Sequence, residues 1–515
     1  MQEQLAALPR NLTGHLQLTL MALMIGIVIS LPLGIWVTRR PHRQGFVIGA
    51  AGVIQTIPTL ALLAVMVPLL AALGQFTSGR FGFAIPGFGY VPAVIALTLY
   101  SLLPLLQNTV AGIRGVEPAL IQAAKGVGMT PMQQLLRVEL PLAMPVVVAG
   151  IRTATIWAVG MATIATPVGA SSLGNYIFSG LQTRNTTAIL FGCVAAALLA
   201  MLLDGLVHAV QSGIQQGRRI RLAVALVGVV LLYAYALGAW IVEAQSSDER
   251  TQVRIGAKPF TEQQILGELI AQSLVQHSNV EARIFRSLGS TVVFDALKHG
   301  EIDVYVDYAG TLWTTALRHR DSPSSEQLRQ QLTEELRERH GIVVLGALGF
   351  DNSYAFAMRD ADARRLGIST LSDVARIAST LVAGADYEFF GRQEWRSVRE
   401  SYGFDFRDKR SMDPSLMYQA IAHRQLDVIS AYTTDGRIRA LNLRLLRDDR
   451  SAIPPYDALL LVNANFAKRH PNVVASLRGL VGRLQTSTMQ QLNLAVDQEG
   501  KTPRDVAAAF LAAQP

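Results

Sequence analysis

Tyrosines placed at turns are the first candidates for binding chemistry in this sequence. Eight of the 13 tyrosines lie beyond residue 250, and four of these stand beside Gly, Asn, Thr or Pro: Tyr308, Tyr354, Tyr432 and Tyr456. Such positions favour the rim of a cleft. A trimethylammonium group cannot donate a hydrogen bond, so ring faces hold it by cation–π attraction, worth about 2 kcal/mol per desolvated ring. Packing explains any one tyrosine equally well, so the predicted cage depends on the set.

The anionic end of such a ligand would need hydrogen-bond donors. Candidates are Arg392, Thr311 and the N-terminus of a helix that begins near Ser290, because helix N-termini present free N–H groups. Arg392 stands among several arginines, and a solvated face explains it equally well. Asp386 and Glu388 either contact a cation or cap a loop.

Catalytic and metal-binding patterns are not found in the sequence. The histidines of the second half are scattered, and Cys193 is the sole cysteine, which excludes an intramolecular disulfide and a cysteine-based metal site. No Gly-rich phosphate-binding loop with its Lys-Ser/Thr occurs either. The sequence therefore predicts no catalytic residue, metal or cofactor on this chain, and any ATP hydrolysis would belong to a separate subunit.

The composition divides the chain into two halves. Residues 1–249 hold 13 Lys+Arg and 7 Asp+Glu, whereas residues 250–515 hold 33 and 31. The first half is typical of a membrane protein and the second of a soluble one. Most of the net charge of +8 comes from the membrane half. It therefore indicates membrane topology and not nucleic-acid binding.

Six apolar runs are long enough to span a bilayer. They are Leu16–Val37, Phe46–Leu73, Val91–Ile113, Leu142–Ala165, Thr187–Val210 and Leu222–Val242. Basic residues cluster after the first run, between the third and fourth, and before the sixth. The positive-inside rule makes that side cytoplasmic. The N-terminus and everything after the sixth run are then outside.

Two charged residues interrupt the apolar runs. Arg152 lies in the fourth run and Asp204 in the fifth. A charge within the membrane is costly and faces a partner, a watery cavity or the interface. For Arg152 the alternatives are snorkelling to the cytoplasmic interface and a role in a gate or a contact between subunits.

The segment Ile121–Pro141 joins the third and fourth runs. Its first part favours a helix, and two glycines then interrupt it. Thr130 is suited to cap a second short helix with Pro131 at its first position. Leu140-Pro141 is expected to end this helix. The sequence predicts a compact helix–break–helix loop.

This loop resembles the coupling loop of binding-protein-dependent ABC importer permeases. The family pattern is Glu-Ala-Ala, three residues, Gly, nine residues, an aliphatic residue, any residue, and Leu-Pro. The matching positions are Ala123, Ala124, Gly128, Val138, Leu140 and Pro141, with Gln122 in place of the usual Glu. The resemblance implies that the loop docks on a dimeric cytoplasmic ABC ATPase. It also implies a homodimer in a lipid bilayer, the bacterial inner membrane, because five spans around one such loop make half a pore.

Strand and helix patterns alternate after a polar linker. This alternation favours an α/β fold with a mostly parallel sheet, and about 265 residues suffice for two lobes. The expected domains are an all-α permease of five core spans at residues 1–217, a sixth span and linker at 218–252, and a two-lobed domain at 253–515. Lobe 1 is expected at about 253–350 and 452–515, and lobe 2 at 351–451.

The second half resembles the quaternary-ammonium-binding proteins of osmoprotectant importers, which have the two-lobed Venus-flytrap fold. The matching segments are Lys258-Pro-Phe-Thr-Glu-Gln, Tyr308-Ala-Gly-Thr, Gly349-Phe-Asp-Asn-Ser-Tyr354, Ala431-Tyr-Thr-Thr-Asp435 and Pro454-Pro-Tyr456. Members bind glycine betaine, choline or carnitine, and some members fused to a permease bind ergothioneine. The resemblance places Thr311, Asn352 and Asp435 near the ligand with the four tyrosines. Ala309 and Asp307 differ from the commoner Thr and Glu.

The preferred interpretation is an importer subunit that carries its own tethered receptor for a small quaternary-ammonium compound. Ergothioneine or another small zwitterion is the alternative ligand. A non-transporting flytrap receptor is a different class of protein and would need an output domain in the cytoplasm. A membrane-anchored enzyme would need a catalytic constellation, and the sequence offers none.

Overall fold

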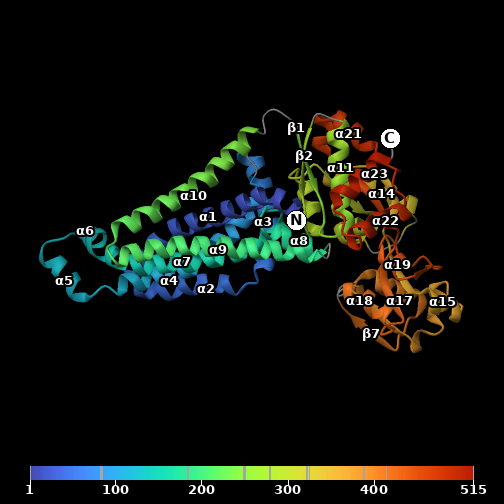
Figure 1. Ribbon diagram of the computed structural model, residues 1–515, viewed down its shortest axis with the longest axis horizontal. Helices are drawn as coiled ribbons and strands as arrows, with labels where there is room; N and C mark the ends of the chain where they lie inside the picture. The colour runs from blue at the N-terminus through green and yellow to red at the C-terminus, as the bar shows by residue number, and fades with distance from the viewer. Residues whose placement is uncertain are drawn as a thin grey trace. The chain divides into compact units, whose positions relative to one another are not determined.

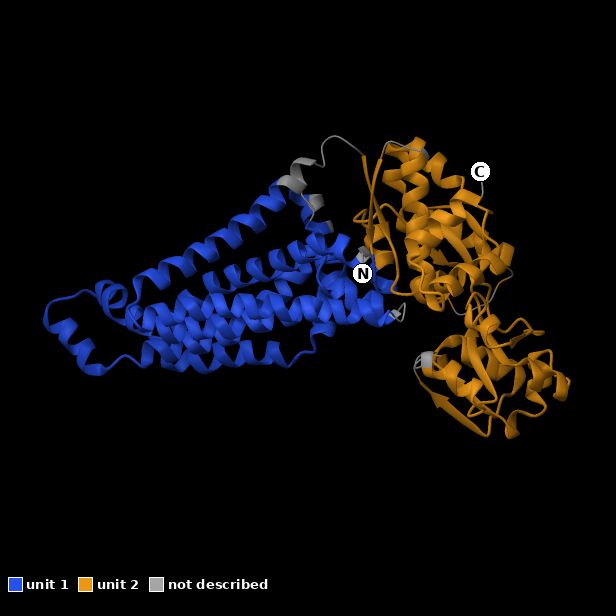
Figure 2. Ribbon diagram, viewed as in Figure 1, with its two compact units in different colours: residues 1–249, 286–292 blue, residues 250–285, 293–515 orange. Residues whose placement is uncertain are grey.

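The computed structural model describes residues 2–81, 85–182, 185–246, 251–277, 280–319, 323, 325–386, 389–412 and 414–513. The chain forms two compact units (Figure 2). One comprises residues 1–249 and 286–292 and the other residues 250–285 and 293–515. Part of the predicted linker, residues 247–250, lies outside the described residues, as does Glu388.

The first unit is a bundle of long apolar helices (Figure 1). Five helices of the described residues are long and apolar enough to cross a membrane. They are α1 (Gln2–Thr38), α4 (Tyr90–Arg114), α7 (Leu140–Ala162, within a helical stretch Pro131–Val168), α9 (Thr186–Gln215) and α10 (Arg219–Ser246). They correspond to five of the six predicted runs, so the all-α membrane half is confirmed.

The remaining run, Phe46–Leu73, is not one continuous helix. It is divided between α2 (Pro41–Thr56) and α3 (Thr59–Phe81), with a bend of 96° between them. Ile57 is extended there, at φ −72° and ψ 127°. The cause is Pro58, because proline disfavours the helical conformation for the residue before it. The count of six spans holds if this bent pair makes one span.

Small residues let the central helices of the bundle approach closely. Helix α4 packs against both α1 and α7. A Cβ added to Gly26 of α1 would lie 2.3 Å from Ser101 Oγ of α4, and one added to Gly150 of α7 would lie 2.5 Å from Asn108 Cβ. Close packing of this kind associates helices in lipid, where the hydrophobic effect gives little between them.

The two charges within the spans form one ion pair. Arg152 of α7 donates from Nε and Nη2 to Asp204 of α9, at 2.5 and 2.8 Å. His208, one turn after Asp204, lies 3.5 Å from Arg152 Nη1. The pair links neighbouring helices and gives each charge the partner that a charge at membrane depth requires.

The second unit is built on two five-stranded sheets (Figure 1), which confirms the two-lobed α/β fold. The first has the order β2 (Val280–Phe285), β1 (Thr251–Gly256), β3 (Val304–Tyr308), β10 (Asp457–Asn463), β4 (Ile342–Asp351). The second has the order β7 (Asp408–Ser411), β6 (Val382–Ala385), β8 (Val428–Tyr432), β5 (Tyr354–Arg359), β9 (Leu443–Leu446). The C-terminal helices α21 (Pro471–Arg478), α22 (Thr486–Asp497) and α23 (Pro503–Ala513) pack on α11 (Thr261–His277) of the first lobe.

The prediction of mostly parallel sheets is wrong. Of the eight strand pairings among the described residues, four are parallel and four antiparallel. Strand β5 runs against both its neighbours, and so does β10. These are the strands that enter a lobe directly after the chain crosses from the other lobe, so no βαβ crossover fixes their direction.

The two crossing segments lie side by side. The first consists of Asn352 and Ser353, between β4 and β5, and the second precedes β10. Asn352 N–H donates to Tyr456 C=O at 3.1 Å, and Tyr456 N–H donates to Asp351 Oδ2 at 2.7 Å. The two segments that connect the lobes are therefore paired with each other, and each has a predicted cage tyrosine at its end: Tyr354 for the first and Tyr456 for the second.

Candidate ligand-binding site and coupling segment

The segment between α4 and α7 has the predicted helix–break–helix form. Helix α5 (Pro118–Gly126) is followed by Gly128 at φ +79°, a conformation that favours glycine. Thr130 then caps α6 (Pro131–Gln134) in a capping box with Gln133. The local signals of the sequence are confirmed in this part of the loop.

The predicted boundary at Leu140-Pro141 agrees with the start of α7, but no break separates α7 from the loop. A π-helical turn, Leu135–Glu139, follows α6 and leads without a break into α7, which begins at Leu140. Leu140 N–H bonds to Leu135 C=O, five residues back. Pro141 falls in the first turn of α7, where its missing N–H is tolerated.

The residues that match the coupling pattern lie mostly at the surface of the unit. Gln122, Ala123, Gly128 and Pro141 are exposed, Val138 and Leu140 are half-buried, and Ala124 is buried. Glu139, which is fully buried beside them, was not among the predicted residues. Its carboxylate binds Arg39 at the end of α1 at 2.5 Å and also accepts from the Gln134 side chain. This ion pair ties the loop to the first span.

Three of the four predicted cage tyrosines meet in the binding unit. Tyr354 of β5 and Tyr432 of β8 are directly opposite each other in the antiparallel register. Their ring centroids are 4.7 Å apart, and Tyr432 Oη donates to Tyr354 Oη at 2.8 Å. The Tyr456 ring lies at a right angle to that of Tyr354, with centroids 6.1 Å apart. Tyr432 is 36% exposed, so the cluster reaches solvent.

A buried ion pair borders this tyrosine cluster. Arg392 donates to Glu394 at 2.9 and 3.1 Å, and its guanidinium lies 5.3 Å from the centre of the Tyr354 ring. Glu394 is 2% exposed and also accepts from Tyr456 Oη. Burial opposes ionisation of Glu394, but Arg392 holds the pKa of this carboxylate below its ordinary value. Burial likewise opposes the charge on Arg392, and the bond to Glu394 raises its pKa.

Charged side chains of both signs act on the tyrosines. Burial raises the pKa of both Tyr354 and Tyr432, which stay protonated. Asp386 and Glu394 also raise the pKa of Tyr354, whereas Arg392 lowers it. Asp386 accepts the Phe389 N–H at 2.9 Å. Because Arg392 is paired with Glu394, the carboxylates beside the rings favour an added cation.

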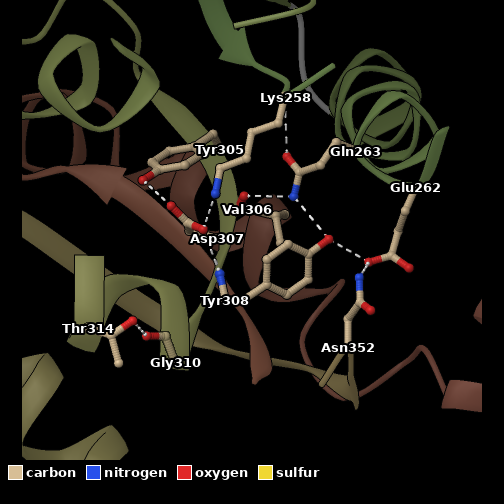
Figure 3. Close-up of polar contacts among 10 residues, drawn as sticks. All are labelled: Lys258, Glu262, Gln263, Tyr305, Val306, Asp307, Tyr308, Gly310, Thr314 and Asn352. Atoms are coloured by element: carbon tan, nitrogen blue, oxygen red, sulfur yellow. Dashed lines mark hydrogen bonds and ion pairs between the residues drawn. The ribbon is translucent and has the colours of Figure 1, made fainter. Parts of the chain in front are cut away.

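Tyr308 has a set of polar partners of its own, which Figure 3 shows. No ring contact found among the described residues joins it to the other three tyrosines. Its ring stacks on Phe260 with centroids 6.2 Å apart, and Lys258 Nζ lies 5.7 Å from its centre. Its hydroxyl donates to Glu262 Oε1 at 2.5 Å. Gly310, two residues after Tyr308, packs directly against the tyrosine cluster: a Cβ added to Gly310 would lie 2.6 Å from the Tyr456 ring.

The remaining candidates have different surroundings. Asn352 donates from Nδ2 to Glu262 at 2.8 Å, and Asp435 holds Arg437 through Nε at 2.8 Å. Thr311 ends the short helix α13 (Ala309–Thr311) and is half-buried. Helix α12 (Ser290–Lys298) begins at the predicted Ser290. The structure therefore gathers Tyr354, Tyr432, Tyr456 and Arg392, and it places Asn352 and Asp435 in neighbouring polar contacts.

Two residues of the cluster are absent from the predicted set. Phe389 is fully buried behind Tyr354, with ring centroids 5.1 Å apart, and Glu394 neutralises Arg392. The spacing Arg-x-Glu was a visible signal for Glu394. Phe389 had no signal, because only the folded chain shows which aromatic ring supports which. With the three tyrosines, these residues form an aromatic site suited to a cation that lacks N–H groups.

Comparison with known proteins identifies both halves. Residues 251–513 match the substrate-binding domain of ABC-type glycine betaine transport systems, and residues 26–221 match the inner membrane component of binding-protein-dependent transport systems. The ergothioneine transport permease/ergothioneine binding protein of Helicobacter pylori (strain G27) is 31% identical over 500 residues, which cover 94% of this chain and 86% of that protein.

Separate relatives match each half alone. The choline transport system permease protein of Bacillus subtilis (strain 168) is 44% identical over 190 residues, 37% of this chain and 80% of the relative. The glycine-betaine-binding protein of Pseudomonas aeruginosa (strain PAO1) is 36% identical over 271 residues, 50% of this chain and 86% of the relative. An importer permease in the membrane half favours transport over the receptor and enzyme alternatives. The chain therefore belongs to the ABC importers of the glycine betaine and osmoprotectant family, in the form that fuses the inner-membrane permease to its substrate-binding domain.

Proposed function

We propose that the ligand of this importer is a small zwitterion whose cationic end is a quaternary ammonium group. The observation that supports it is the cluster of Tyr354, Tyr432 and Tyr456, with the carboxylates of Asp386 and Glu394 acting on it. Each desolvated ring face contributes up to about 2 kcal/mol to binding a methylated ammonium. A methylated ammonium has no N–H group that must find an acceptor when it leaves water, whereas a primary amine has three.

Arg392 is proposed to receive the ligand's carboxylate. Its side chain is 24% exposed, and it lies over one face of Tyr354. A zwitterion would therefore place its cation against the rings and its anion toward the guanidinium. Glycine betaine, carnitine and ergothioneine carry both groups, whereas choline lacks the carboxylate, so we expect choline to bind more weakly.

Ergothioneine is a specific candidate within this class. The Helicobacter pylori relative is named for ergothioneine, and it matches this chain across the permease and the binding domain alike. The relatives named for choline and glycine betaine match one half each.

The membrane half is proposed to work with partners. A cytoplasmic dimer of ABC ATPase subunits would dock on the exposed surface of the coupling segment, and a second copy of this chain would complete the pore. The N-terminus and the binding domain would lie outside the cell, as the distribution of basic residues indicates. Ligand binding would close the two lobes, and ATP hydrolysis would alternate the access of the pore.

The test is uptake of radiolabelled glycine betaine, carnitine and ergothioneine by cells that lack the chromosomal copy. The wild-type chain should restore uptake of at least one compound. Tyr432→Ala should raise the half-saturating concentration. Gly128→Val should lower the maximal rate alone, because Gly128 has φ +79° and turns the coupling segment. No restored uptake of any compound would contradict the proposed ligand class.

A further inference from the structure

Glu262 is a buried carboxylate that connects four separate parts of the binding unit. It lies in the first turn of α11 and is 3% exposed. Its Oε1 accepts from Tyr308 Oη at 2.5 Å and from Asn352 Nδ2 at 2.8 Å (Figure 3). Its Oε2 accepts from Asn493 Nδ2 of α22 at 3.1 Å, and the same amide donates to Thr434 C=O at 2.9 Å. These partners belong to both lobes and to the crossing segment between them.

The partners of Glu262 that these contacts identify are all neutral. The nearby cation, Lys258, is bound instead to Asp307, and both are almost fully buried (Figure 3). Burial raises the pKa of Glu262, and the side-chain hydrogen bonds that it accepts act in the opposite direction. A buried carboxylate held by several neutral donors is costly to keep unless each bond is made. The cluster therefore fixes the positions of its donors.

Two residues of this cluster, Tyr308 and Thr434, belong to segments that carry cage candidates. The Tyr308 ring is held at its hydroxyl end by Glu262 and by Gln263 Nε2, which lies 3.2 Å from Tyr308 Oη. Thr434 follows Tyr432 by two residues, and Asn493 also donates to Thr434 C=O at 2.9 Å. Glu262 thus contacts Tyr308 of the first lobe directly. Through Asn493 it is also connected to the turn that follows Tyr432 of the second lobe.

We propose that Glu262 is a positioning residue for ligand binding, which fixes the Tyr308 ring and the Thr434 turn in the orientation that the ligand meets. This inference rests on the proposed function and extends it, because it adds Tyr308 of the first lobe to the rings that contact the ligand. The physical reason is preorganisation: when a ring occupies its binding orientation only part of the time, the apparent affinity falls by that fraction. Glu262 itself does not touch the ligand.

The test is a double-mutant cycle on the full-length chain in detergent. Ligand affinity is measured by calorimetry for wild type, Glu262→Gln, Tyr308→Phe and the double variant, with glycine betaine, carnitine and ergothioneine as probes. Tyr308→Phe keeps the ring and removes only the hydroxyl. Glu268→Gln is the matched control, because it makes the same change two turns along α11, where the carboxylate binds Gln272 at 3.2 Å.

Each single variant should weaken binding by about tenfold or more, as the loss of a hydrogen bond to a charged group implies. The double variant should bind no more weakly than the weaker-binding single variant, because both changes remove one interaction. Glu268→Gln should bind like wild type. Unchanged affinity in Tyr308→Phe would overturn the inference, even if Glu262→Gln does not fold. So would a lower melting temperature with unchanged affinity in Glu262→Gln. A wild-type chain that binds none of the probes would contradict the proposed function and the inference with it.

Discussion

Removal of Arg392 is expected to destabilise the binding unit in a way that depends on pH. In the native domain Glu394 is 2% exposed and receives two hydrogen bonds from Arg392. In Arg392→Ala the Glu394 carboxylate loses its cation and keeps the hydrogen bond from the Tyr456 hydroxyl. A buried pair that loses one partner typically costs about 3–5 kcal/mol. Because Arg392 is partly exposed and water could replace it, we expect about 3 kcal/mol at pH 7.

The sign of the pH dependence follows from the pKa of Glu394. In the wild type this pKa is below its ordinary value, so the carboxylate stabilises the fold above about pH 4.3, and this contribution is lost as the pH falls through the lowered pKa. In Arg392→Ala the guanidinium no longer opposes the effect of burial, so the pKa of Glu394 should rise above its ordinary value. Glu394 is then protonated as the pH falls, and the variant becomes more stable than it is at pH 7. The difference in the free energy of unfolding between the variant and the wild type should therefore become smaller at low pH.

Urea unfolding of residues 250–515 as a separate chain measures this effect. A free-standing relative aligns with this region, and a single domain gives a better-defined free energy of unfolding than the whole chain. Glu394→Gln should cost about 1–2 kcal/mol, because the Arg392 that remains is partly hydrated. The matched control is Arg396→Ala, an exposed arginine of the same helix. The reasoning is refuted if Arg392→Ala costs no more than Arg396→Ala, or if its cost does not change with pH.

Three further outcomes are expected. Gly310→Ala should weaken ligand binding, because the added Cβ displaces the Tyr456 ring. Gly391→Ala is the control and should bind like wild type, because its added Cβ meets nothing within 4 Å. Equal affinities of the two variants in a titration would contradict this prediction. Asp373→Asn should cost about 1 kcal/mol in urea unfolding at pH 7. Hydrogen bonds from the Ser369 and Thr370 N–H groups help hold the pKa of Asp373 at about 2. The loss of stability in Asp373→Asn should therefore disappear as the pH falls from about 4 toward 2. A difference in the free energy of unfolding that stays constant with pH would contradict this. In a Cys193→Ser background, an impermeant maleimide should label a cysteine at Gln498 in intact cells and one at Val127 only after lysis; the reverse would overturn the orientation.

Local signals in the sequence were enough for the membrane spans and for the coupling segment. The apolar runs give the long helices because length and hydropathy decide whether a segment spans a bilayer. Thr130, Pro131 and Gly128 act on their immediate neighbours, and the structure places each as predicted. The break at Pro58 also had a local signal, although the apolar run around it concealed it.

The remainder depends on contacts between residues that are distant in the sequence. Arg152 and Asp204 are 52 residues apart, and each charge alone gives no indication of its partner. Tyr354 and Tyr432 meet because β5 and β8 pair in one register, and the sequence does not reveal that register. The same holds for Glu262, whose partner Asn493 lies 231 residues further along the chain. The types of site residue could be predicted, but their grouping required the fold.

The most direct test of the central claim is calorimetric titration of the full-length chain. The ligands are glycine betaine, choline, carnitine, proline betaine and ergothioneine, with glycine and ethanolamine as unmethylated controls. We expect micromolar or tighter binding of at least one methylated zwitterion, no binding of glycine, and an affinity about 30-fold lower in Tyr432→Ala, which corresponds to the loss of about 2 kcal/mol from one ring. Silence toward all five compounds, or glycine binding as tightly as glycine betaine, would contradict the account.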